Sequence, residues 1–204
     1  MVKVKICGIT NLKDALVSID AGCDALGFVF YKKSPRYISP EQAKKIIQKL
    51  PKNIIKVGVF VNEKEEKIKA TARLCKLDML QFHGRESPVF CDKFKDYKII
   101  KAFRVRENIN LPNISRYKTF AYLFDAYLPG KMGGTGKTAD WRLLTKVRSL
   151  KKPVFLSGGL AADNVKEAIS KVKPSWVDVS SSLEVRPGKK DEIKIREFAA
   201  CLEK

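Results

Sequence analysis

Residues 154–182 have the sequence VFLSGGLAADNVKEAISKVKPSWVDVSSS, and this stretch holds the unit from which the rest of the chain is built. Two short apolar runs, Val154–Ser157 and Val177–Ser180, are typical of buried strands. The segment Asp163–Val172 between them is charged and amphipathic, which predicts a helix. A strand, a helix and a second strand in this order predict a βαβ unit with parallel strands.

The same alternation of strand and helix continues toward both ends of the chain. We expect strands at Val2–Cys7, Ala25–Phe30, Ile54–Val61, Met79–Phe82, Lys98–Phe103, Phe120–Asp125, Val154–Ser157 and Val177–Ser180. We expect helices near Leu12–Ala21, Pro40–Leu50, Glu63–Leu74, Ser87–Phe94, Trp141–Leu150, Asp163–Val172 and Ile193–Leu202. The connection from Arg104 to Arg116 contains Pro112 and is expected to be short or irregular. Eight alternating strands predict an α/β fold and favour a closed (β/α)8 TIM barrel over an open doubly wound sheet.

Length and composition suit one globular domain over residues 1–204. The chain has 204 residues and is 45% hydrophobic. Because such barrels range from about 200 residues upward, this one would be near-minimal, with short loops. The start of the chain has no apolar secretory segment, and apolar runs such as Ala25–Phe30 are far short of the ~20 residues of a spanning helix. We therefore expect a cytoplasmic protein without membrane contact.

Cysteine and histidine usage bears on metals and redox state. The chain has five cysteines, an odd number without close pairs, which argues against disulfides and a zinc knuckle and fits a reducing compartment. With His83 as the single histidine, a His-rich catalytic metal site is not expected.

The formal charge of +19 does not by itself indicate a nucleic-acid binder. The basic residues are mostly lysines, spread over nearly every predicted helix and mixed with Glu and Asp, which is typical of solvated helix faces. We expect no nucleic-acid partner, although a basic, non-catalytic binder remains an alternative. A positive field would help to gather an anionic substrate.

Two neighbouring strand ends carry candidate phosphate loops. Gly158 and Gly159 directly follow one predicted strand, and the next predicted strand ends at Ser180 and Ser181. Glycines let backbone N–H groups approach a phosphate, and the loops after the last two strands of a barrel often bind one together. Either loop alone would be compatible with an ordinary tight turn, but the pair favours a phosphate site.

A second glycine-rich segment, Gly130–Thr138, resembles an ATP-binding P-loop but lacks its spacing, because Lys131 stands where the motif requires glycine. We expect a mobile active-site loop here, with a plain flexible turn as the alternative.

Three further residues are candidates for chemistry because they lie at the ends of predicted strands or just after them. Cys7 ends the first strand before Gly8; a buried hydrophobic role is the alternative. Asp125 ends an apolar strand, where a carboxylate needs a partner or a function; the alternative is a structural acid. Arg36 follows the second strand and could bind a substrate carboxylate or remain a solvated charge.

In order along the chain, these motifs resemble the phosphoribosylanthranilate isomerase family of tryptophan biosynthesis. The resemblance extends from residue 3 to about residue 191. Its blocks are KICGIT (5–10), GFVF (27–30), SPRYI (34–38), VGVFVN (57–62), LQFHG (80–84), GGTG (133–136), DW (140–141), LSGGL (156–160) and VDVSS (177–181).

The resemblance implies a (β/α)8 barrel that catalyses a cofactor-free, metal-free Amadori rearrangement of a small phosphorylated substrate. It implies Cys7 as general base and Asp125 as general acid, and a monomer or homodimer. The implied contacts to the substrate are Arg36 for its carboxylate, Gln81, His83 and Asp178, and for its phosphate Gly158, Gly159, Ser180 and Ser181. Ser182 departs from the family, which commonly has glycine there, and this puts the fine geometry of the phosphate loop in question.

Strand alternation gives one expectation that is independent of the family. Lys5 shares a strand face with Cys7, so it should lie one layer deeper in the barrel lumen. A buried ammonium needs a carboxylate partner, for which Asp178 is our choice and Asp125 the alternative. Another sugar-phosphate barrel enzyme, such as an epimerase, would share the phosphate loops but usually needs a metal or different acid–base residues.

Overall fold

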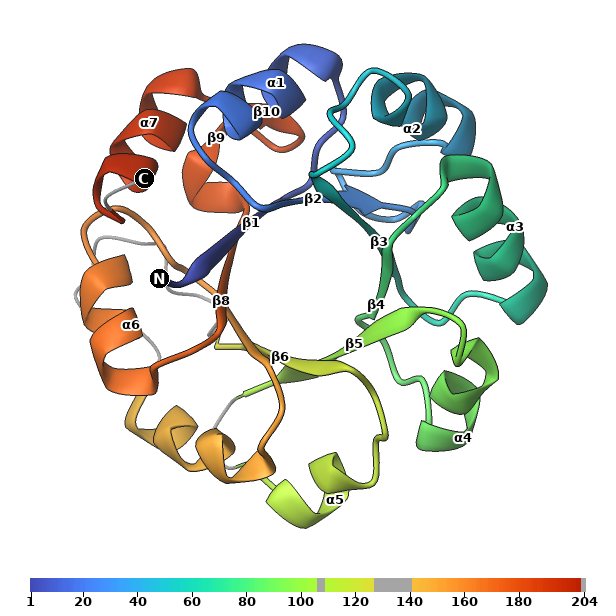
Figure 1. The fold of residues 1–204 in the computed structure, drawn as a ribbon, viewed down its shortest axis with the longest axis vertical. Helices are drawn as coiled ribbons and strands as arrows, with labels where there is room; N and C mark the ends of the chain where they lie inside the picture. The colour runs from blue at the N-terminus through green and yellow to red at the C-terminus, as the bar shows by residue number, and fades with distance from the viewer. Residues whose placement is uncertain (106–108, 127–140, 203–204) are drawn as a thin grey trace.

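The computed structural model describes residues 1–105, 109–126 and 141–202. Eight parallel strands close into a barrel in which each strand pairs with the next and the last pairs with the first (Figure 1). The strands are β1 (Lys3–Cys7), β2 (Ala25–Val29), β3 (Ile55–Phe60), β4 (Met79–Phe82), β5 (Lys98–Arg104), β6 (Ala121–Asp125), β7 (Val154–Ser157) and β8 (Trp176–Val179). The predicted (β/α)8 barrel is therefore confirmed.

Helices surround the strands on the outside of the ring (Figure 1). The α-helices are α1 (Leu12–Asp20), α2 (Pro40–Ile47), α3 (Glu65–Cys75), α4 (Pro88–Cys91), α5 (Leu111–Ser115), α6 (Val165–Val172) and α7 (Glu192–Ala200). Every described helix is too short or too polar to cross a bilayer. Two predicted helices differ in detail: α4 passes into the 3₁₀ turn η1 (Asp92–Phe94), and η2 (Trp141–Leu150) is 3₁₀ throughout.

Local sequence explains where several helices begin. The Ser39 hydroxyl accepts a hydrogen bond from the Gln42 N–H, and the Gln42 side-chain oxygen accepts one from the Ser39 N–H. Pro40 occupies the first turn of α2. The Asn11 side chain accepts from the N–H of Asp14 at the start of α1. These caps satisfy N–H groups that have no partner within the helix.

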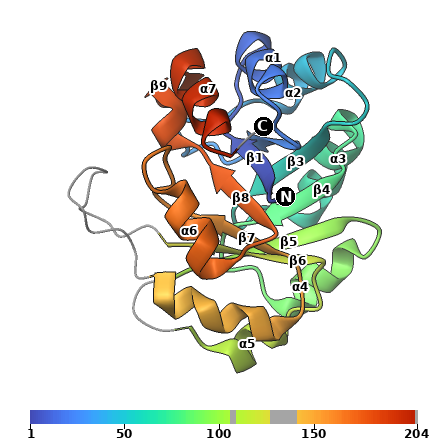
Figure 2. The same ribbon diagram turned by 60° about the vertical axis from the view of Figure 1, so that its left-hand side comes forward.

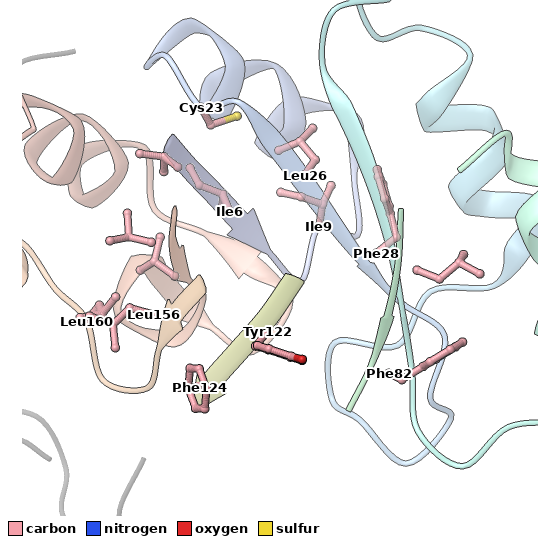
Figure 3. Close-up of a cluster of buried hydrophobic side chains, with 14 of the residues drawn as sticks. Ile6, Ile9, Cys23, Leu26, Phe28, Phe82, Tyr122, Phe124, Leu156 and Leu160 are labelled. Carbon is pink, nitrogen blue, oxygen red and sulfur yellow. The ribbon is translucent and has the colours of Figure 1, made fainter. Parts of the chain in front are cut away.

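Alternating side chains of the strands fill two separate regions. Outward-facing residues such as Ile6, Leu26 and Phe124 belong to the same core cluster as buried helix residues. Figure 3 shows their side chains. The lower lumen holds its own apolar cluster, made of Ala25, Val57, Met79, Ile100, Ala102, Ala121, Leu123, Phe155 and Trp176. Both faces of each strand are buried, as is usual for all-parallel sheets. The lower lumen is thus a packed core, which leaves the carboxyl ends of the strands as the place for a site.

A two-stranded antiparallel hairpin that was not among the predicted elements follows β8. The 3₁₀ turn η3 (Ser181–Leu183) leads into β9 (Glu184–Arg186), which pairs with β10 (Lys189–Lys190). In Figure 2, β9 lies beside α7 at the edge of the barrel. Gly188, at φ +80°, makes the turn, and the Pro187–Gly188 dipeptide is a turn signal that could have revealed it.

Candidate active site

A polar arc occupies the mouth of the barrel at the carboxyl ends of adjacent strands. Lys5 pairs in register with Asp178, Asp178 with Ser157, and Ser157 with Asp125. On the other side, Val29 and Val59 pack with Cys7 as an apolar cluster. The mouth therefore has a polar side on β6, β7, β8 and β1 and an apolar side on β2 and β3.

The first strand places Lys5 and Cys7 in the lumen, as strand alternation predicted. The Lys5 side chain is fully buried, and its Nζ donates to Asp178 Oδ1 at 2.7 Å. A Cβ on Gly27 would lie 2.7 Å from Cys7 Sγ and 3.1 Å from Lys5 Nζ. Asp178 is the partner of Lys5, and Gly27 is the neighbour whose missing side chain leaves room for both groups.

Burial and the nearby lysines shift the pKa of Cys7 in opposite directions. Burial raises the pKa of the thiol above its usual 9.0; Lys5 and Lys190 lower it, and Asp178 raises it. Burial would lower the pKa of Lys5, but the charges of Asp178 and Cys7 raise it above 10.5. Lys5 is the nearby positive charge that we expected, yet burial outweighs it. A base at this position therefore depends on nearby positive charge.

Asp125 lies at the end of β6, three strands around the ring from Cys7. Its Oδ2 is 3.4 Å from Nε2 of His83. The amide Nε2 of Gln81 is 3.2 Å from Nδ1 of the same ring. If Gln81 donates to Nδ1, the ring proton is on Nε2 and faces the carboxylate. The structure thus brings Gln81, His83 and Asp125 together; Gln81 Oε1 is buried and makes no hydrogen bond among the described residues.

Arg36 is held by Glu184, which was not among the predicted site residues. Its Nε lies 2.9 and 3.1 Å from the two carboxylate oxygens of Glu184, and its Nη2 lies 2.7 Å from Oε2. Glu184 also accepts from Lys190 Nζ at 3.0 Å. Glu184 stands two residues after Ser182 in the phosphate-loop motif, which was a usable signal. Lys190 had no such signal.

The two glycine- and serine-rich loops lie on neighbouring strands, β7 and β8. Gly158 and Gly159 have φ of +97° and +68°, and a Cβ on Gly159 would meet no atom within 4 Å. Position 159 therefore favours glycine because of its positive φ, and not because a side chain would lack space. The N–H groups of Gly159 and Ser181 make no hydrogen bond within the described part of the chain. They are available to an anion.

Serine side chains tie these loops to their surroundings. The hydroxyl of Ser180 donates to the carbonyl of Cys7 at 3.0 Å, and that of Ser182 donates to the carbonyl of Leu160. Ser182 is not among the residues with positive φ. Serine at this position therefore joins the two loops without backbone strain.

Other expectations concern the P-loop-like segment and metals. The segment 130–138 lies outside the described residues. Among the residues that the structure describes, no cluster of three or more His, Cys, Asp or Glu side chains is arranged to hold a metal ion.

Comparison with known proteins agrees with this geometry. The family model for N-(5'phosphoribosyl)anthranilate (PRA) isomerase matches residues 4–200. The N-(5'-phosphoribosyl)anthranilate isomerase of Pelobacter propionicus is 52% identical over 198 residues, which cover 97% of this chain and 94% of that protein. The isomerase of Geobacter sulfurreducens is 50% identical, with 97% of each chain covered.

Solved structures give the same result. The crystal structure of phosphoribosyl anthranilate isomerase from Thermotoga maritima is 46% identical, with a TM-score of 0.93 and coverage of 100% of this chain and 99% of that one. A second isomerase structure, in complex with reduced 1-(o-carboxyphenylamino)-1-deoxyribulose 5-phosphate, is 44% identical with a TM-score of 0.90 and the same coverage. The chain belongs to the N-(5'-phosphoribosyl)anthranilate isomerase family.

Proposed function

We propose that this chain converts N-(5'-phosphoribosyl)anthranilate into 1-(2-carboxyphenylamino)-1-deoxyribulose 5-phosphate, the Amadori rearrangement of tryptophan biosynthesis, with Cys7 as base and Asp125 as acid. Membership of the isomerase family supports the reaction. One observation carries the residue roles: around the ring, β7 and β8 with their candidate phosphate loops lie between Asp125 on β6 and Cys7 on β1. A sugar anchored by its phosphate there has the acid on one side and the thiol on the other.

The rearrangement needs a proton at one atom and its removal at another. Asp125 protonates the furanose ring oxygen, the C1'–O bond breaks, and a Schiff base forms at C1'. Cys7 then removes the proton on C2', and the enolamine tautomerises to the ketone. Each such general catalyst contributes about 10²–10⁴-fold. His83 supports Asp125 by a contact to its Oδ2.

The apolar side of the mouth suits the aromatic ring of the substrate. Val29 and Val59 are buried there, with Tyr31 packed against them. Arg36, on the loop after β2, uses its Nε–Nη2 edge for Glu184. A substrate carboxylate therefore meets the other edge of the guanidinium, Nη1 and Nη2. The apolar cluster and Arg36 therefore both lie on the β2 side of the mouth, away from Asp125.

A direct assay tests the proposal. Purified protein is mixed with freshly formed phosphoribosylanthranilate, and loss of its fluorescence is followed together with formation of the product. Cys7→Ala should fold normally and lose most of its turnover. Cys75→Ala is the matched control, because Cys75 is also buried but lies on α3, where its thiol bonds the Pro40 carbonyl. An inactive wild type would refute the activity, and a fully active Cys7→Ala would remove Cys7 from the mechanism.

Assembly and location are further parts of this proposal. We expect a monomer or a homodimer acting in the cytoplasm. A related structure is described as mutually generated monomers of the dimeric isomerase from Thermotoga maritima. Light scattering after gel filtration measures the mass in solution, and a tetramer or larger assembly would contradict the expectation.

A further inference from the structure

Lys190 is buried beneath the active-site rim and connects three of its elements. The residue is 3% exposed, and its Nζ donates to the carbonyl of Cys7 at 2.6 Å, the carbonyl of Ser180 at 3.1 Å and Glu184 Oε1 at 3.0 Å. An ammonium has three donors, so these acceptors use all of them. The Lys190 N–H donates to Asp14 Oδ2 at 2.7 Å, which fixes the hairpin on α1. Both ends of the residue are therefore held in place.

The charges around Lys190 do not cancel. Lys5 is paired with Asp178, so that couple is neutral. Glu184 serves two cations, Arg36 and Lys190. Asp14, which accepts from the Lys190 N–H, is paired with Lys189. The Arg36–Glu184–Lys190 group therefore keeps one positive charge, and the ammonium contacts the Cys7 carbonyl. Burial lowers the pKa of Lys190, although Glu184 opposes this.

We propose that Lys190 is a positioning residue of the isomerisation: it joins the ends of β1 and β8, orients Arg36 through Glu184, and supplies the uncancelled positive charge that favours the thiolate of Cys7. The inference rests on the proposed function, since it assigns Cys7 as base and Arg36 as carboxylate ligand. Apart from the Arg36–Glu184–Lys190 group, the charged or titratable groups near Cys7 in the described part of the chain are Lys5, Asp178 and Tyr31. Of these, only Lys5 is a cation; it lowers the pKa of Cys7, but it is paired with Asp178, which raises that pKa.

The first experiment measures the thiolate directly. Iodoacetamide labelling of Cys7 is followed from pH 6 to 10 by mass spectrometry of the Cys7 peptide. In Lys190→Met the labelling rate below the thiol pKa should fall by about tenfold or more, because a nearby cation is lost. Lys101→Met is the matched control: Lys101 is equally buried and paired with Glu86, but it contacts the carbonyls of Phe82 and Gly84. Equal labelling curves for the two variants would overturn the inference.

A second variant keeps the test decisive if Lys190→Met does not fold. Glu184→Gln retains Lys190 and removes the negative charge, so Cys7 should label faster at a given pH, the opposite of the Lys190→Met result. The same variant should raise KM for the substrate more than it lowers kcat, since Arg36 loses its support. Labelling that is unchanged or slower would overturn the inference. An inactive wild type would instead refute the proposed function, so the two failures are distinguishable.

Discussion

Replacing Lys5 by methionine tests the buried pair on which the catalytic end of β1 depends. The Lys5 side chain is fully buried, and that of Asp178 is only 6% exposed. Removing one partner of a buried pair leaves an uncompensated charge and typically costs about 3–5 kcal/mol. For a domain of this size each kcal/mol lowers Tm by about 2–4 °C, so we expect a decrease of about 6–20 °C.

Calorimetry with two comparison variants measures this effect. Lys67→Met removes the exposed end of an i,i+4 pair with Glu63 and should change stability by less than about 1 kcal/mol. The double variant Lys5→Met/Asp178→Asn removes both buried charges and should recover part of the loss. A Tm within a few degrees of wild type for Lys5→Met, or a double variant less stable than the single one, would refute the reasoning.

The same variant has a defined pH signature. Because the pKa of Lys5 is raised in the folded protein, its contribution to stability is fully present below the ordinary value of 10.5 and is lost as pH rises through the folded-state value. The stability gap between wild type and Lys5→Met should therefore be constant across neutral pH. The pH optimum of the activity should shift upward in Lys5→Met, because Cys7 loses a neighbouring cation and keeps Asp178.

The acid, the phosphate site and Glu184 can each be tested separately. Asp125→Asn should lower kcat by at least about 10²-fold with little change in KM; a loss confined to KM would make Asp125 a binding residue. A crystal grown with sulfate should place the anion within hydrogen-bonding reach of the Gly159 and Ser181 N–H groups, and consistent binding at 133–136 instead would contradict the phosphate site. Burial would raise the pKa of Glu184, but the hydrogen bond from Arg36 and the charge of Lys190 lower it below 4.5, so its contribution to stability is lost as pH falls through the folded-state value. Urea midpoints of Glu184→Gln should therefore decline less below pH 4.5 than those of wild type, and parallel declines would refute this.

The fold could be predicted because its signals are local. The run Ala25–Val29 is buried at every residue, as a strand covered on both faces must be. Such runs alternate with amphipathic helices along the whole chain. The same alternation predicts Lys5 in the lumen beside Cys7, where the structure has it. The prediction of Asp178 as its partner needed only the closure of the barrel, which makes β8 the neighbour of β1.

Other local features were predicted less well, because they depend on packing. The segment Trp141–Leu150 has helical spacing of its apolar residues, but it winds as a 3₁₀ helix. The hairpin of β9 and β10 is too short and too charged to show a strand pattern. In both cases the intrinsic preference of the segment is weak, and its tertiary contacts decide the conformation.

By itself, the sequence determined the order of strands and helices, the end of the barrel that carries the site, and the residues with suitable chemistry there. Only the tertiary structure decided how those residues are paired. Arg36 and Glu184 are 148 positions apart, and Lys190 reaches the Cys7 carbonyl across 183. Side-chain periodicity is a property of neighbouring residues, whereas these contacts exist only once the barrel closes and the hairpin packs on α1.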